Sequence, residues 1–113
     1  MQTPSPVVLI MTTAPDIETA RTIARALVEG NVAACVSIGQ PVLSIYRWQG
    51  TIEETSEIPL QIKTSAARYQ QVEAAIKAAH PYDVPEIIAV SVQAGLPIYL
   101  NWVRDVTAPS SHA

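Results

Sequence analysis

The chain has 113 residues, which is the length of one ordinary domain. Hydrophobic residues make up 49% and charged residues only 15%, so the composition excludes a disordered protein and leaves more apolar surface than a small monomer readily buries. The net charge is −3 and no two basic residues are adjacent, which argues against nucleic-acid or anionic-membrane partners. We therefore expect a single domain over residues 1–113 that associates with itself, with a core of about 7–105 and loose ends at 1–6 and 107–113.

Cysteine use and hydropathy predict a cytoplasmic location. Cys35 is the only cysteine, so the chain has no internal disulfide and suits a reducing compartment. The apolar run Val7–Met11 is far too short to cross a membrane, and no basic residue precedes it as in a secretory signal.

The first part of the chain predicts a strand followed by a helix. Val7–Met11 is continuously apolar and mostly branched, which favours a strand covered on both faces. Asp16 is typical of a helix N-cap, and apolar residues recur at helical spacing from Ala20 to Val28. Gly30 then favours a helix end with a positive φ.

A strand pair joined by a tight turn is predicted next. Val32–Ile38 and Val42–Trp48 are rich in β-forming residues and are separated by a Gly-Gln-Pro kink. Gln49–Gly50 suits a hairpin turn, and the residues from Ile58 to Lys63 alternate as in a half-buried strand. Pro59 cannot donate a ladder hydrogen bond, so this strand should be a local edge or bulged there.

The remaining elements are a helix, a strand and a short C-terminal helix. Ser65 can cap the first of these helices, and His80–Pro81 should end it, because the residue before proline disfavours helical φ and ψ. Glu86–Val92 is another apolar strand, and Pro97 can open the last helix. The inner stripe of the first helix would comprise Tyr69, Val72, Ile76 and Ala79.

The order βαββαβ with an added C-terminal helix predicts an α+β, ferredoxin-like sandwich. Right-handed crossovers place both helices of the repeat on one face of a four-stranded antiparallel sheet. The other face needs a cover, and a partner subunit is the simplest one. We expect that face to carry Leu43, Ile45, Leu60 and Ile62.

Common catalytic motifs do not occur in the sequence. It has no glycine-rich phosphate loop, no Cys-x-x-Cys pair and no His-Glu-x-x-His run. A nucleophile pair would have to join Cys35 to His80, because His112 lies in the expected loose tail. Cys35 sits inside the apolar run Val32–Val36, which favours a buried and inert thiol. We therefore expect a protein that is not an enzyme.

The segment His80–Glu86 is unusual because it holds two prolines, which should fix its polar side chains in place. One interpretation is a pocket rim, with His80 as a donor, acceptor or metal ligand and Glu86 as an oxygen ligand. The other, equally favoured, is a rigid connector whose histidine caps the preceding helix.

Aromatic residues beside the hairpin turn are the second unusual feature. Tyr46 and Trp48 flank the turn, and Glu57 follows it, which favours an interface or the wall of a ligand cleft over a solvated hairpin tip. Lys63 ends the next strand, and a lone lysine in that place is more often only solvated.

These segments resemble the CutA family, the divalent-cation tolerance proteins. The resemblance runs in order over about residues 7–105, and its most specific parts are the His-Pro-Tyr-x-x-Pro-Glu run and the Tyr-x-Trp-x-Gly turn. The matching stretches are Thr13–Asp16, Ala33–Val36, Tyr46–Gly50 with Glu57, Lys63–Thr64, His80–Tyr82 with Pro85–Glu86, and Tyr99 with Trp102.

The resemblance implies a tight homotrimer built like the nitrogen-regulatory PII proteins, with sheets packed around a threefold axis. The hairpin would reach a neighbouring subunit, with Tyr46 and Trp48 in the trimer interface, and leave clefts between subunits. By the same resemblance, the ligand-binding cleft would be lined by Cys35, Trp48, Glu57, Lys63, His80, Tyr82 and Glu86.

The family name also implies a role with divalent cations such as copper. Some members have a cysteine where this chain has Thr12 and a further histidine where it has Ala79, so His80 and Glu86 remain as metal-ligand candidates, with Cys35 only if it faces the cleft. We expect no required cofactor and a small molecule or ion bound in the inter-subunit clefts. The alternatives are direct binding of copper or another divalent metal, and a trimeric scaffold that anchors partner proteins.

Overall fold

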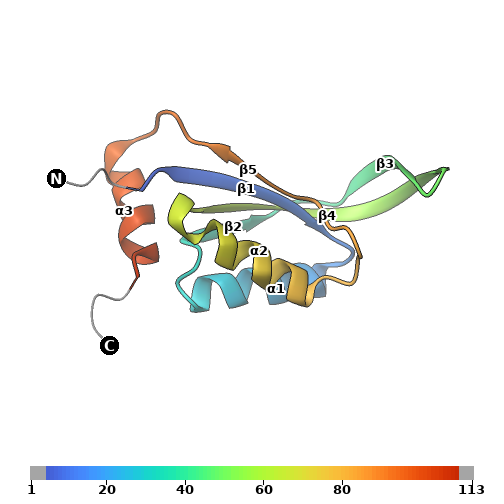
Figure 1. Cartoon of the computed structure of the whole chain (residues 1–113), viewed down its shortest axis with the longest axis horizontal. Coiled ribbons are helices and arrows are strands. Elements are labelled where there is room, and N and C mark those ends of the chain that lie inside the picture. Colours follow the sequence, from blue (N-terminus) through green and yellow to red (C-terminus); the bar gives the residue numbers. More distant parts are fainter. Residues whose placement is uncertain (1–4, 110–113) are drawn as a thin grey trace.

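The computed structural model describes residues 5–109 and has the ferredoxin-like order of elements predicted from the sequence, with the additional C-terminal helix (Figure 1). The elements are β1 (Val7–Ala14), α1 (Ile17–Glu29), β2 (Cys35–Ile38), β3 (Val42–Trp48), β4 (Thr51–Ser65), the 3₁₀ helix η1 (Ala66–Arg68), α2 (Tyr69–Ala79), β5 (Ile87–Ser91) and α3 (Pro97–Thr107).

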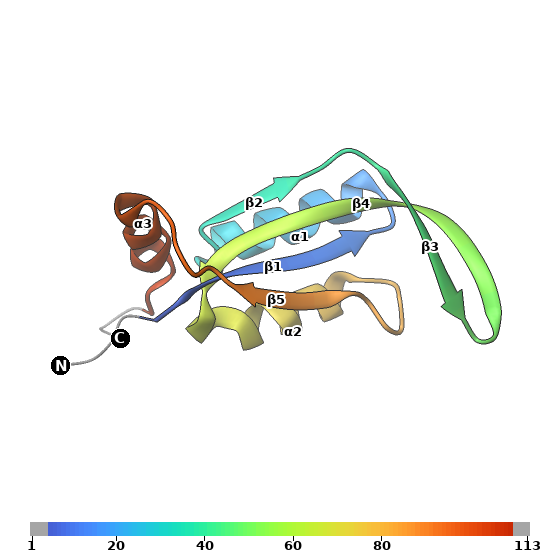
Figure 2. The same ribbon diagram turned by 90° about the horizontal axis from the view of Figure 1, so that it is seen from above.

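The sheet is antiparallel throughout, in the order β2-β4-β1-β5, and β3 pairs with the outer part of β4. Helices α1 and α2 lie side by side beneath one face of the sheet, as right-handed crossovers require (Figures 1 and 2). Helix α3 lies at one end of the sheet, and the β3–β4 hairpin extends beyond the opposite end (Figure 2).

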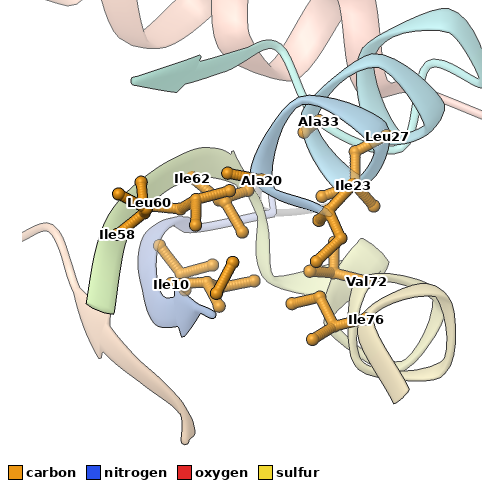
Figure 3. Packing of buried hydrophobic residues seen from close by; sticks show 12 residues of the cluster. Ile10, Ala20, Ile23, Leu27, Ala33, Ile58, Leu60, Ile62, Val72 and Ile76 are labelled. Carbon is orange, nitrogen blue, oxygen red and sulfur yellow. The ribbon is translucent and has the colours of Figure 1, made fainter. Parts of the chain in front are cut away.

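The core lies between the sheet and these two helices. Side chains alternate along a strand, so Ile10 of β1 and its register partner Ile62 of β4 both point toward the helices. Helix α2 contributes Val72 and Ile76, and both are fully buried (Figure 3). The remaining buried members of the cluster are Val8, Ala14, Ala20, Ile23, Leu27, Ala33, Ile58 and Leu60.

The prediction for the uncovered face was wrong. Leu60 and Ile62 are 1% and 0% exposed and belong to the core. Leu43 and Ile45 are exposed on the hairpin, but they pair with Ser56 and Glu54, so alternation puts them on the same side of β4 as Leu60 and not on its open face. Alternation gives the open face of β1 and β5 a different apolar set. Its members are Leu9, Met11, Ile88 and Val90.

The end of α1 also differs from the prediction. Gly30 has a φ of −86°, and the left-handed residue is Asn31 with a φ of 58°. The N–H groups of Val32 and Ala33 both donate to the carbonyl of Leu27, so these two residues belong to the C-terminal cap of α1. The strand expected at 32–38 therefore begins only at Cys35.

Ser65 precedes η1, but its hydroxyl makes no capping bond and instead lies 3.1 Å from the hydroxyl of Thr107. The predicted cap is therefore absent, and α2 starts after the 3₁₀ turn. Ala79, predicted on the inner stripe of α2, is exposed, and Ala75 packs against the core in its place.

The described inner ends of the expected loose segments are bound to the domain. The carbonyl of Pro6 accepts the N–H of Ala66 at 2.7 Å, and the carbonyl of Thr107 accepts Nε of Arg68 at 2.7 Å. The rest of these segments, with His112, lies outside the described residues.

Pro59 lies at a position of β4 that belongs to no ladder with β2 or β3, which suits a residue without an N–H. It faces Thr13 of β1, while its carbonyl accepts the N–H of Gly39 at 2.9 Å on the other side. Pairing with β2 stops at Leu60 and pairing with β3 starts at Glu57, so Pro59 falls in the break between them. The prediction of a local strand edge is confirmed.

Candidate functional site

A pocket of about 920 Å³ lies between the β3–β4 hairpin and the loop that joins α2 to β5. This volume is within the range of small-molecule sites. We call it the hairpin pocket. It is lined by Thr13, Ser44, Ile45, Tyr46, Arg47, Trp48, Glu57, Pro81, Tyr82, Asp83, Val84, Pro85 and Glu86.

The hairpin supplies one wall through its register. Tyr46 pairs with Glu53 and Trp48 with Thr51, so alternation puts both rings on the face of β4 that carries Glu57. The hydroxyl of Tyr46 lies 3.0 Å from that of Thr55, which fixes the tyrosine ring along the hairpin.

The opposite wall is the proline-flanked loop. Helix α2 ends at Ala79, as predicted, because His80 precedes a proline and is extended, with φ −91° and ψ 135°. The ring of His80 meets that of Tyr82 edge to face, with centroids 4.6 Å apart. Tyr82 is thereby held against the end of the sheet.

His80 lies behind this wall and is only 7% exposed. Its Nε2 is 2.7 Å from the carbonyl oxygen of Thr13, and its Nδ1 accepts the N–H of Tyr82 at 3.2 Å. Both ring nitrogens are therefore engaged with the protein in this conformation. These bonds anchor the loop to β1.

Glu57 is the most buried acid of the pocket, with 7% exposure. Its Oε2 accepts a hydrogen bond from the Thr13 hydroxyl at 3.3 Å. Burial, and next the nearby Glu57 carboxylate, raise the pKa of the Tyr82 phenol. The two groups therefore share one poorly solvated corner of the pocket.

Cys35 and Lys63, both expected in the cleft, lie elsewhere in this chain. They face each other across β2 and β4, and Nζ of Lys63 donates to the Ser37 hydroxyl at 3.1 Å. Lys63 is four residues along β4 from Pro59, which faces Thr13, so this pair is about 13 Å from the His80 end of the strands. The structure therefore does not bring Cys35 and His80 together as a nucleophile pair.

Among the expected cleft residues, the structure brings Trp48, Glu57, Tyr82 and Glu86 into one pocket. Thr13 and Asp83 also line the pocket, and neither was predicted from the sequence as a wall residue. Asp83 lies between the two prolines of the loop, and this position in the sequence could have indicated that it lines the pocket. Nothing in the sequence placed Thr13 beside Glu57, because 44 residues separate them.

No group of three or more His, Cys, Asp or Glu side chains that could hold a metal ion occurs within residues 5–109. In the same part of the chain, no helix is long and apolar enough to cross a membrane.

The split βαβ order, the sheet with one open face and the pocket beside the hairpin define a ferredoxin-like α+β protein with a ligand-sized site. The family described as "CutA1 divalent ion tolerance protein" matches residues 8–106. The chain belongs to the CutA family of divalent-cation tolerance proteins. The resemblance stated from the sequence is confirmed.

Individual relatives agree with this assignment. A divalent-cation tolerance protein CutA of Thermus thermophilus is 46% identical over 88% of this chain and 96% of its own length. The CutA protein of Mus musculus is 41% identical over 97% of this chain, which spans only 62% of the mouse protein. The crystal structure of CutA from Xylella fastidiosa is 47% identical, with a TM-score of 0.88 over 91% of this chain and 99% of that one.

The names of relatives place them in more than one compartment. A solved CutA structure from Archaeoglobus fulgidus is described as periplasmic, and a relative in Arabidopsis thaliana is named chloroplastic.

Proposed function

We propose that this protein takes part in divalent-cation tolerance by binding a small molecule or ion in the hairpin pocket, and that it is not an enzyme. The observation that carries the proposal is a ligand-sized pocket whose loop wall is already fixed by Pro81, Pro85 and the two hydrogen bonds of His80. A preformed wall lowers the entropy cost of binding. Among the described residues that line the pocket there is no cysteine and no histidine, so the Cys35–His80 nucleophile pair considered from the sequence is not part of the wall.

The assembly that we propose is a cytoplasmic homotrimer. It is supported by the apolar open face of the sheet, where Ile88 and Val90 are 51% and 46% exposed. A neighbouring subunit packed on that face would supply the Cys35 and Lys63 that lie away from the pocket in their own chain. Tyr46 and Trp48 would contact the neighbour through the hairpin.

A thermal-shift screen against a metabolite library tests the pocket. We expect hits whose stabilisation is lost in a Tyr82→Ala, Glu86→Ala double variant, because both residues line the wall. A Gln70→Ala, Lys77→Ala double variant on the exposed side of α2 is the matched control and should keep every hit. Hits that survive unchanged in the wall variant would refute binding at this pocket.

Direct metal binding is the second candidate, for which the pocket offers the carboxylates of Glu57 on the hairpin side and of Asp83 and Glu86 on the opposite loop, although no three such side chains in residues 5–109 form a metal-holding group within this chain. Calorimetric titration of the metal-free protein with copper and with zinc tests it, with Glu57→Gln and His80→Ala variants alongside. Submicromolar binding lost in Glu57→Gln would support a metal site. Millimolar or absent binding would remove this candidate.

A further inference from the structure

The open face of the sheet carries few charges, and β4 supplies all of those that lie on strands. Ile62 of β4 points into the core, so alternation puts Glu53, Glu57 and Lys63 of the same strand on the open side. The hydrogen bond from the Thr13 hydroxyl to Glu57 agrees with this placement, because Thr13 lies on the open side of β1. Among the five strands that the structure describes, no other charged side chain lies on this face.

The two signs of charge lie at opposite ends of the face. The hairpin, with its two acids, is at one end of the sheet, and the C-terminal end of β4, with Lys63, is at the other (Figure 2). Glu57 and Lys63 are six residues apart, about 20 Å along the strand, so they cannot pair within one chain. The middle of the face is apolar and consists of Leu9, Met11, Ile88 and Val90.

Neither charge meets an opposite charge in its own chain. Within residues 5–109, no ion pair involves Glu57 or Lys63. The neighbours of Glu57 are the hydroxyl of Thr13 at 3.3 Å and the phenol of Tyr82, and both are neutral. Nζ of Lys63 donates to the neutral hydroxyl of Ser37 at 3.1 Å. A carboxylate that is only 7% exposed is stabilised by an opposite charge brought beside it.

A closed ring of three subunits needs a face with two different ends. In such a ring each contact is heterologous, which means that a patch on one subunit meets a different patch on the next. The hairpin end and the Lys63 end of the open face are two such patches. Laying the hairpin end over the Lys63 end of the next subunit brings acid to base at every contact and buries the apolar middle.

We propose that the open face is complementary to a second copy of itself, with Glu57 of each subunit paired to Lys63 of the partner subunit around the ring. The aliphatic stem of that lysine packs along the ring of Trp48, which lines the hairpin pocket with Glu57. The pair fixes the direction of the ring and closes one side of the pocket. This inference rests on the trimer of the proposed function, since it names the contact that orders that trimer.

A zero-length carbodiimide cross-linker tests the contact directly, because it joins a carboxylate to an amine only where the two touch. Lys63 and Lys77 are the only lysines of the chain, so few products are possible. We expect a peptide pair that joins Glu57 to Lys63, in a species of dimer mass on a denaturing gel. Lys77, on the exposed side of α2, is the internal control and should join no acid of the hairpin.

A double-mutant cycle gives a second readout that does not depend on access of the reagent. Glu57→Gln and Lys63→Met remove one charge each and should each lower the thermal midpoint of the trimer by about 4 °C. The double variant should be no less stable than the weaker single variant, whereas independent sites about 20 Å apart would add. Glu53→Gln, on the same face of the hairpin, is the matched control and should keep the parent midpoint.

The outcomes separate this inference from the proposed function. The cross-link or a non-additive cycle supports the contact. A trimeric protein with no such cross-link and with additive effects would overturn it, while leaving both the trimer and ligand binding in the pocket intact. Cross-links from Lys63 to Glu53 without any to Glu57 would overturn the assigned pair. A parent that sediments as a monomer would refute both the contact and the assembly.

Discussion

His80 is held from both sides of its ring. Because Nδ1 accepts the N–H of Tyr82, the proton of the neutral ring lies on Nε2, which donates to the Thr13 carbonyl. One side chain therefore ties the loop to β1 and positions the tyrosine that follows. Both interpretations of the sequence expected a fixed histidine, but neither identified a carbonyl 67 residues away as its partner.

Replacing His80 with alanine leaves the buried carbonyl of Thr13 without its donor. We expect the free energy of unfolding to fall by about 1–3 kcal/mol. Urea unfolding followed by circular dichroism measures the change. Lys77→Ala, on the exposed side of α2, should change it by less than about 0.5 kcal/mol, and equal stability of the two variants would contradict the anchoring role.

Asp16 is the N-cap of α1, as predicted from the sequence. Its Oδ1 accepts the N–H of Thr19 at 2.7 Å, and this bond lowers the pKa of the carboxyl below its ordinary value of 3.8. A carboxyl whose pKa falls on folding adds stability above its ordinary pKa, and that stability is lost as the pH falls through the lowered value.

An Asp16→Asn variant keeps the acceptor oxygen but no longer titrates. We expect its unfolding free energy to stay close to that of the parent at pH 7 and to fall less steeply below about pH 4. Asp16→Ala should be less stable than both at pH 7. Urea unfolding at a series of pH values distinguishes the three proteins, and parallel pH profiles for parent and Asp16→Asn would refute the assignment.

At the scale of elements, the hairpin depends on its two-residue turn. Gln49 and Gly50 have φ values of 50° and 83°, the pair of positive angles that matches the twist of the flanking strands. A Cβ on Gly50 would meet no atom within 4 Å, so the cost of a substitution there is conformational rather than steric.

Gly50→Ala should lower the free energy of unfolding by about 1 kcal/mol. Gly50→Asn should cost less, because asparagine tolerates left-handed backbone. Thermal unfolding ranks the three proteins, and in a Trp102→Phe background the emission of Trp48 reports whether the hairpin itself has loosened. The same stability for alanine and asparagine would show that the strained turn relaxes.

The pattern of an element identifies its faces but not which face is covered. The alternation in β4 correctly grouped Leu60 with Ile62, but the same pattern is compatible with helices on either side of the strand. The choice depends on the crossover geometry of α1 and α2, which no local pattern encodes. The predicted capping bond of Ser65 is absent for a similar reason, because its hydroxyl instead lies within hydrogen-bond distance of the Thr107 hydroxyl, 42 residues further along the chain.

At the scale of the molecule, the sequence indicated each of the two walls of the pocket but not that they lie opposite each other. The hairpin and the proline-flanked loop were each singled out by composition, and Glu57, Tyr82 and Glu86 do line the pocket that they form. Cys35 and Lys63 were grouped with them only by family resemblance, and in one chain they lie on a different part of the sheet. That separation fits a cleft completed by a neighbouring subunit in the proposed trimer.

The open sheet face gives the proposed trimer its test. An Ile88→Lys, Val90→Lys double variant puts two charges on that face and should convert a trimer at micromolar concentration into monomers. Ile17→Lys on α1 starts from a comparable exposure of 43% and should remain trimeric. Sedimentation velocity measures all three proteins, and a monomeric parent would refute the assembly.

Strand β4 has 15 residues, about 50 Å at an ordinary rise per residue, in a molecule whose longest extent is 52 Å. Its inner part pairs with β1 and β2, while residues 51–57 pair with β3 alone. Amide hydrogen exchange should therefore vary along this one strand, with residues 60–64 exchanging only through global opening and residues 51–56 through local opening of the hairpin. A ligand bound at the pocket would slow exchange at the outer end by blocking local opening of the hairpin, and at the inner end only as far as it raises the free energy of global unfolding. The difference between the two ends therefore reports occupancy of the site, and the inner end reports the stability of the core.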